Sequence, residues 1–297
     1  MMVNMKLSQP SFGVGIAGMV LSNIFYSIMA IFIRLDPATN PLEAAFYRFA
    51  VGAALVASLA FVGKTHLRFR NFRGLLWRGI IGGLSVVLFY LPINTLGLGK
   101  TSLIQYTYPF FALAFSALWL KERSKPSAWI LTGVAIVGLV LLNLPLLGQG
   151  KLDWMLLAAW GSAITSGLAV TFVKKLTETE SSSAIFLAQC IGGFWIILIP
   201  ANLSPGTWGW GPAFLLLGVG LTAAVGQLLM TWSYRWVDVS TGSLMGTMVP
   251  VLNVAAGVLL FHESFTLLEA IGGLMTLVAC FLLVLVKGRS QVQQATT

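Results

Sequence analysis

The chain has 297 residues, of which 57% are hydrophobic and 9% are charged, and its formal net charge is +9. A soluble domain of this length needs a more polar exterior, so the composition excludes a soluble globular protein. The apolar runs are long and continuous, which favours helices that cross a membrane over the short alternating strands of a membrane barrel. We therefore predict an all-α integral membrane protein.

Polar residues divide the chain into ten apolar runs, and each run is predicted to form one transmembrane helix. In the first half these runs cover residues 12–33, 42–62, 75–96, 103–120 and 128–147. In the second half they cover residues 154–173, 184–201, 212–234, 241–261 and 267–286. All connections are short, so the sequence predicts no soluble domain between the helices.

The basic residues are distributed unevenly between the two sets of connections, and this bias predicts the orientation of the chain. If the N-terminus is cytoplasmic, the cytoplasmic segments carry 14 Lys and Arg residues, Arg78 among them, and the external segments carry 3. Because ten helices return the chain to its starting side, both termini are predicted to be cytoplasmic. The basic excess is then explained by topology, and no nucleic-acid partner is expected.

Two apolar runs in different halves of the chain begin and end alike. They are PFFALAFSALWLKE at residues 109–122 and PVLNVAAGVLLFHE at residues 250–263. A shift of 141 positions superposes their prolines and their glutamates, and it matches six residues in the 21-residue window 102–122. The same shift places Gly79 on Gly220. The two halves are therefore predicted to be copies of one unit.

Each copy contains five predicted helices, which is an odd number. The second copy must therefore cross the membrane in the opposite sense to the first. We predict two inverted five-helix repeats, with residues 1–147 in the first and residues 148–297 in the second. Inverted repeats are typical of secondary transporters, in which the halves rock around a central site.

Three sequence motifs strengthen this interpretation. PLEAAFYRF opens the second run, LWLKE ends the fourth and LLFHE ends the ninth. Their order and spacing, together with the duplication, resemble the EamA family of the drug/metabolite transporter (DMT) superfamily over nearly the whole chain. The resemblance implies a multi-pass inner-membrane carrier with a cavity between its halves, commonly an exporter of amino acids or other small metabolites. It implies no particular substrate.

Motifs typical of enzymes are absent from the sequence. There is no GxSxG, HExxH, P-loop or CxxC pattern, and no loop is long enough to hold nucleotide-binding machinery. We therefore predict that the chain is not an enzyme, binds no cofactor or metal, and is not driven by ATP. The expected partners are a small-molecule substrate and the lipid bilayer.

Arg48 lies inside the second predicted helix, about 9 Å along it from the outer end. It can contact a substrate carboxylate or a gating partner, or it can hold helix-end carbonyls, Glu43 or Asp36 as a structural clamp. Because the family resemblance implies an arginine here whatever the substrate, the structural interpretation is favoured. No acidic residue lies deep in a predicted helix, so a neutral or zwitterionic substrate is favoured over a cationic drug.

Uncharged polar and aromatic side chains inside the predicted helices are the candidate cavity residues, because amides and hydroxyls orient a metabolite while rings enclose it. Each of them can equally form a hydrogen bond between helices. The candidates are Asn23, Tyr26, Tyr90, Asn94, Gln105, Tyr106, Tyr108, Trp160, Gln189, Gln227, Met248 and Asn253.

Four residues of the two similar runs are candidate gating elements. Pro109 and Pro250 interrupt apolar helices, so they are predicted to be flexible points beside the cavity or local packing kinks. Glu122 and Glu263 end the fourth and ninth helices on opposite sides of the membrane. They are predicted to close gates, or to bind neighbouring Lys and Arg residues.

The sequence thus predicts an alternating-access carrier of a small polar metabolite, an amino acid or a related compound, with export as the expected direction. The alternatives are an uptake or exchange carrier for a nucleotide-like or sulfonium metabolite and, less favoured, a membrane scaffold or receptor. Coupling to a proton or a counter-substrate and facilitated diffusion are all compatible with the sequence. Nothing in it indicates an oligomeric state.

Overall fold

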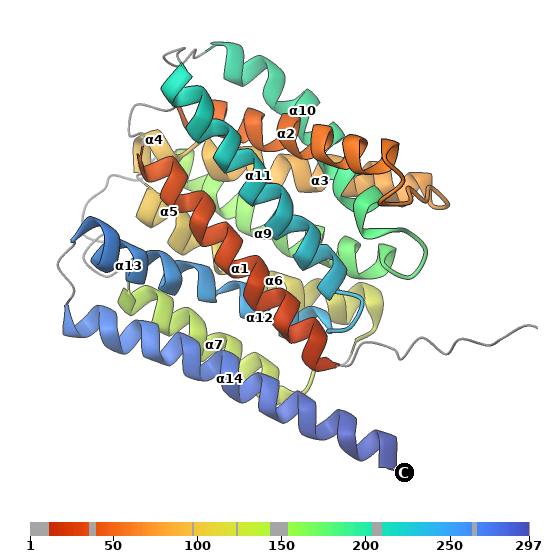
Figure 1. Ribbon diagram of the computed structural model, residues 1–297. Helices are drawn as coiled ribbons and strands as arrows, with labels where there is room; N and C mark the ends of the chain where they lie inside the picture. The colour runs from red at the N-terminus through yellow and green to blue at the C-terminus, as the bar shows by residue number, and fades with distance from the viewer. Residues whose placement is uncertain are drawn as a thin grey trace, which may run out of the picture.

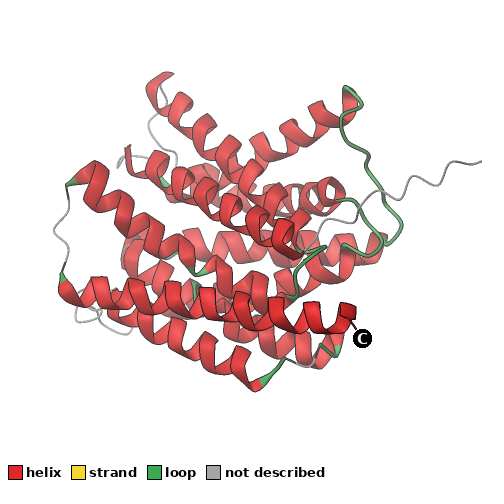
Figure 2. Ribbon diagram, turned by 60° about the horizontal axis from the view of Figure 1, so that its bottom comes forward, coloured by secondary structure: helices red, strands yellow, loops and turns green. Residues whose placement is uncertain are grey.

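A computed structural model describes residues 12–35, 40–96, 98–122, 124–142, 154–203, 210–262 and 266–296. Within these segments every regular element is a helix and none is a strand (Figure 2). Nine helices in the described part are long and apolar enough to cross a membrane, and the shorter apolar helix 126–141 is the tenth of the predicted set. The prediction of an all-α multi-pass membrane protein is confirmed.

The helices follow one another in the order shown in Figure 1. In the first half they are α1 (Phe12–Leu35), α2 (Pro41–Phe61), α3 (Phe72–Tyr90), α4 (Ile93–Leu96), α5 (Leu98–Gln105), α6 (Tyr108–Phe115), the π-helical η1 (Ser116–Leu120) and α7 (Pro126–Leu142). In the second half they are α9 (Trp154–Leu176), α10 (Ser182–Leu203), α11 (Trp210–Ser233), α12 (Val239–Gly246), α13 (Met248–Phe261) and α14 (Leu267–Thr296).

The third predicted helix differs from the observed one at both ends. Helix α3 begins at Phe72 because the side chain of Asn71 caps it, accepting a hydrogen bond of 2.9 Å from the backbone N–H of Gly74. It ends at Tyr90, shortly before Pro92, which has no N–H to continue the helical ladder. The early start adds a turn of helix before Arg78, which lies in the third predicted run although it was counted with the basic residues of a cytoplasmic segment.

The fourth and ninth predicted helices are both broken. The regular α-helix is interrupted between α5 and α6 and again at Thr247, shortly before Pro109 and Pro250. A proline removes one N–H and displaces the carbonyl four residues earlier, which accounts for a break at each place. Both helices also end in a left-handed residue, with φ of 54° at Lys121 and 53° at His262, which are 141 positions apart.

The two halves interlock instead of lying side by side. Helix α1 packs against α11, α3 packs against α9 and α10, and α2 packs against α10 and α11, while α7 packs against α14. Helix α1 starts and α14 ends at the same end of the bundle (Figure 1), as an even number of crossings requires. We call this the terminal end and the other the distal end.

Glycine contacts show that the halves are built alike. A Cβ atom placed on Gly192 would lie 2.8 Å from Cα of Gly79, and one placed on Gly220 would lie 2.6 Å from Cβ of Val51. Each position of the first contact is related to its counterpart in the second by the same shift of 141 residues. Contacts between α3 and α10 are thus repeated between α11 and α2, which agrees with the predicted repeat architecture.

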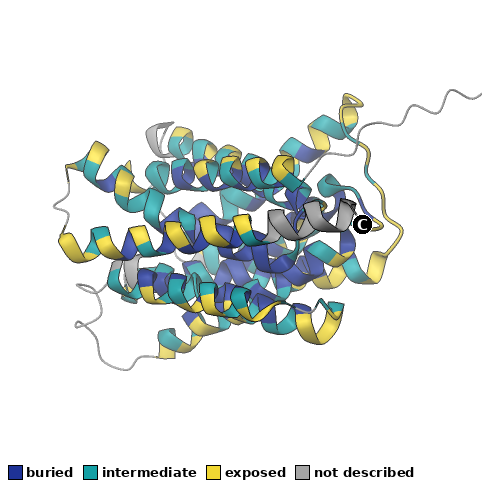
Figure 3. Ribbon diagram, turned by 90° about the horizontal axis from the view of Figure 1, so that it is seen from below, coloured by how far each residue is buried: buried dark blue, intermediate teal, exposed yellow. Residues whose placement is uncertain are grey.

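The outer surface of the bundle is apolar and the residues between the helices are buried (Figure 3). The large apolar side chains of Leu157 and Phe214 are 74% and 71% exposed, and both lie in the first turn of a helix of membrane-spanning length. Side chains of this kind are stable in lipid and not in water. The exposed surface therefore fits a protein that crosses a membrane many times.

Candidate functional site

A cavity of about 200 Å³ lies between the two halves of the bundle. Residues of α1, α2, α3, α5 and α6 line it from the first half, and residues of α9 to α13 line it from the second. At the distal end its lining includes Ile33, Pro41 and Ile93, which lie where α1 ends, where α2 begins and in α4. The cavity therefore extends from the centre of the bundle toward the distal end.

Nine of the twelve candidate cavity residues line this space, and so does Arg48. The nine are Asn23, Tyr26, Tyr90, Gln105, Tyr106, Tyr108, Gln189, Gln227 and Asn253. Trp160 and Met248 are not among the lining residues: Trp160 is 42% exposed with its ring against Phe111, and Met248 packs in the hydrophobic core. The side chain of Asn94 and the whole of Glu263 lie outside the described residues.

Gln227 of α11 connects the cavity to α1 and α2. Its Oε1 atom accepts a hydrogen bond of 2.6 Å from the hydroxyl of Tyr26 and a longer one of 3.4 Å from Nη2 of Arg48. The guanidinium of Arg48 also lies 5.6 Å from the ring centre of Tyr26, within cation–π range. Arg48 is thus held by an amide and a ring from two helices.

Several other candidates form hydrogen bonds between helices. Asn23 donates from Nδ2 to the carbonyl of Met245 at 2.8 Å, which joins α1 to α12. Gln105 donates from Nε2 to Ser166 at 2.7 Å, and its Oε1 atom accepts from Ser162, so both ends of its amide are bound to α9. Asn23 and Gln105 therefore form the hydrogen bonds between helices that the sequence analysis gave as the alternative role of every candidate.

Arg78 of α3 is the main feature that the sequence analysis missed. It is only 2% exposed, it lines the cavity, and its Nη2 atom donates a hydrogen bond of 2.7 Å to Oε1 of Gln189. Its position is possible because Gly82, one turn later, has no side chain: a Cβ atom there would overlap Nη1 of Arg78. The third predicted run already contained Arg78 near its start, and the helix cap at Asn71 is the sequence signal that places it further from the helix end.

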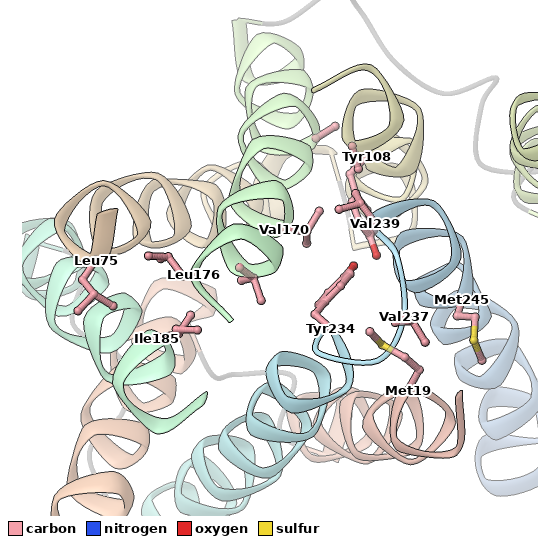
Figure 4. Close-up of a cluster of buried hydrophobic side chains, with 13 residues drawn as sticks. Met19, Leu75, Tyr108, Val170, Leu176, Ile185, Tyr234, Val237, Val239 and Met245 are labelled. Carbon is pink, nitrogen blue, oxygen red and sulfur yellow. The ribbon is translucent and has the colours of Figure 1, made fainter. Parts of the chain in front are cut away.

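The terminal end of the bundle is closed by a cluster of buried side chains. Met19, Tyr108, Val170, Tyr234, Val237, Val239 and Met245 belong to it. In Figure 4 the rings of Tyr108 and Tyr234 are directed into the space between the helices. The hydroxyl of Tyr108 donates to the carbonyl of Ser243 at 3.0 Å, so α6 and α12 meet here. We call this group the terminal cluster.

Polar contacts between the halves reinforce the terminal end. The carboxylate of Glu180, which is 3% exposed, accepts hydrogen bonds from the backbone N–H groups of Arg70 and Asn71, the shortest of them 2.7 Å long. Glu122 accepts from the backbone N–H of Val239 at 3.3 Å, at the start of α12. Each carboxylate thus binds backbone of the opposite half. Glu180 was not singled out from the sequence, because it lies in a connection between two helices.

Two inverted sets of membrane helices, one helix in each broken, surround a cavity that contains charged and amide side chains and is closed at one end. This is the architecture of a membrane transporter. The model of the EamA-like transporter family matches residues 13–144 and 153–285 of the chain. The chain belongs to this family.

Three curated relatives extend over most of the chain. The pseudopaline exporter CntI of Pseudomonas aeruginosa is 25% identical over 91% of this chain and 95% of its own length. The riboflavin transporter of Rhizobium johnstonii is 26% identical over 84% of this chain and 83% of its own length. The human solute carrier family 35 member G1 is 24% identical over 92% of this chain and 79% of its own length.

A solved crystal structure has the same fold. It superposes with a TM-score of 0.77 over 94% of this chain and 99% of its own, at 18% sequence identity. The family and these relatives are transporters, so the predicted class of protein is confirmed.

Proposed function

We propose that this protein is a secondary transporter that moves a small polar metabolite, an amino acid or a related compound, out of the cell across the inner membrane. The observation that carries the proposal is the cavity between the halves, which extends toward the distal end and is closed at the terminal end by the terminal cluster. A site open toward one side at a time is what alternating access requires. The relative named as a pseudopaline exporter supports the outward direction.

The cavity favours a small cargo. Its volume of about 200 Å³ lies below the 300–1,000 Å³ of typical drug-binding pockets. If both termini are cytoplasmic, as the basic residues predict, the described conformation is closed toward the cytoplasm and exposes the cavity outward. The cargo would then be released from this conformation.

Four tyrosines in the lining favour a second candidate function, because aromatic side chains stack on ring-containing molecules. They are Tyr26, Tyr90, Tyr106 and Tyr108. In this case the protein is an uptake or exchange carrier for a nucleotide-like metabolite, and the relative named as a riboflavin transporter supports it. Measuring the direction of flux separates the two candidates.

Flux in liposomes tests the proposal. Purified protein is reconstituted into vesicles loaded with a defined mixture of amino acids, nucleotides, organic acids, sugars and amines, and the contents on both sides are followed by mass spectrometry. We expect a few related compounds to move, with saturation and with counterflow when the same compound is present outside. If no compound moves while an established carrier works in parallel, the protein is not the proposed transporter, and a flux that never saturates indicates a channel.

Gly82→Ala is expected to reduce the flux of the moved compound about tenfold while the protein still folds. The new methyl group occupies the space of Arg78 Nη1, so the guanidinium must leave its position, which a flexible side chain can do without displacing a helix. Flux and thermal midpoint are measured for Gly82→Ala, Arg78→Gln and the double variant. Both changes act on the guanidinium of Arg78, so the flux of the double variant should be no lower than that of Arg78→Gln. Additive losses of flux would show that Gly82→Ala does not act by displacing Arg78.

A further inference from the structure

The charges of the cavity are unbalanced. Among the described lining residues there are two arginines, Arg48 and Arg78, and no aspartate or glutamate. The preference for a neutral or zwitterionic substrate did not take account of Arg78, which was counted with the basic residues of a cytoplasmic segment and which the structure places in the cavity.

Among the described residues, Arg78 has N–H donors that lack acceptors and a positive charge that lacks a counter-charge. A guanidinium has five N–H donors, yet no described residue accepts a hydrogen bond from Nε or Nη1 of Arg78. Its one acceptor among the described residues, the amide oxygen of Gln189, is neutral and cannot balance the charge. A buried charge without a partner of opposite sign is costly, and removing such a charge tends to leave stability unchanged or raise it. Stability alone does not explain an arginine at this place.

The amide of Gln227, beside Arg48, has a further hydrogen-bond donor that faces no acceptor among the described residues. Nε2 of Gln227 is buried without an acceptor among the described residues, while its Oε1 atom is held by Tyr26 and Arg48. Both arginines belong to the first half of the chain, and both glutamines belong to the second. An anionic group in the cavity would thus be contacted from both halves. This arrangement suits a site around which the halves move.

We propose that the cargo is a small organic anion, whose carboxylate or phosphate group is bound by Arg78 with Arg48 beside it. This inference rests on the proposed transport function and narrows its substrate class to metabolites with a net negative charge. Arg78 is the main contact because its donors lack acceptors, whereas Arg48 is already held by Gln227 and Tyr26. Charge-assisted bonds to a guanidinium are the strongest that the described cavity residues offer.

Flux of matched compounds tests the charge preference. The liposomes contain succinate and succinamide, glutamate and glutamine, and glycerol 3-phosphate and glycerol, so that each anion has a neutral or zwitterionic twin and carboxylates are separated from phosphates. We expect anions to move at least about tenfold faster than their twins, and Arg78→Gln to remove this preference. Arg73→Gln, which removes an exposed arginine from the same helix, is the matched control and should keep it. Equal flux of the twins, or movement of neutral compounds only, overturns the inference while transport itself stands.

A binding measurement tests the site without transport. We expect succinate or glycerol 3-phosphate to raise the thermal midpoint of the wild-type protein and of Arg73→Met, but not that of Arg78→Met, and succinamide and glycerol to raise none of them. Without added anion, Arg78→Met should be as stable as the wild type or more stable. A clearly less stable Arg78→Met with an unchanged anion response assigns Arg78 a structural role and overturns the proposal.

Arg78→Lys keeps the proposal testable if Arg78→Met does not fold. It retains the charge but loses the planar donor set, so anions should still stabilise it, with an affinity about tenfold lower than the wild type. Equal affinity of Arg78→Lys and the wild type contradicts a guanidinium contact. If anions bind selectively through Arg78 but nothing moves in liposomes, the anion site stands and the transport function fails.

Discussion

Gly192→Val is expected to abolish most of the folded protein, because it separates two helices that touch through their backbones. A Cβ atom on Gly192 would lie 2.8 Å from Cα of Gly79 on α3, and backbone atoms cannot rotate aside as a side chain can. Overpacking of this kind costs about 3 kcal/mol or more, a large part of the net stability of a protein. The contact also joins the two halves, so the cavity between them would be distorted.

Gly133→Val is the matched control for this prediction. Gly133 lies in α7, and a Cβ atom placed on it meets nothing within 4 Å. The yield of monodisperse protein after detergent extraction and its thermal midpoint should fall sharply for Gly192→Val and stay near wild type for Gly133→Val. Similar values for the two variants would contradict the close helix contact.

Glu180→Ala is expected to open the terminal end of the bundle. The carboxylate accepts from two backbone N–H groups of the segment that precedes α3, and bonds to a charged acceptor contribute about 1.5–3 kcal/mol each. Their loss removes a cross-half contact made in the described conformation, so the population that is open at the terminal end should rise about tenfold or more. Glu122 supports the same end through α12, and Glu122→Gln should act in the same direction with a smaller effect.

Thiol labelling measures this shift. Val237→Cys reports on the terminal cluster, in a background where the buried cysteines are replaced as Cys190→Ala and Cys280→Ser. Labelling should be faster in Glu180→Ala than in the parent and unchanged in Glu178→Ala, which removes the same charge from an exposed residue two positions away. An equal rate in all three proteins would show that Glu180 does not hold the terminal end closed.

Much of the fold could be predicted from the sequence. Burying polar groups in lipid is costly, so each membrane helix is a long apolar run with polar residues at its ends. The shift of 141 residues recovered a duplication whose physical counterpart is the repeated contact at Gly79 and Gly220. The breaks at Pro109 and Pro250 followed from the missing N–H of proline. Composition alone could not predict the residue at which each helix starts, or which of its side chains face the cavity.

Arg78 illustrates that limit. It was counted with the basic residues before it although it lies in the third predicted run, and the cap at Asn71 and the space at Gly82 account for its side chain lying inside the bundle. Trp160 shows the converse, because depth within a helix does not reveal which face points to the cavity, and its ring packs on Phe111 instead. Contacts between halves, such as that of Glu180, depend on tertiary structure and left no periodic signal in the sequence.

Alternating access predicts that one cavity position can be reached from each side of the membrane in turn. Ser102 lines the cavity, and Ser102→Cys in the cysteine-free background can be labelled with a membrane-impermeant thiol reagent applied to either side of oriented vesicles. We expect labelling from both sides, slowed by a transported compound, with faster labelling from the terminal side in Glu180→Ala. Labelling from one side only, in the parent and in Glu180→Ala alike, would contradict alternating access.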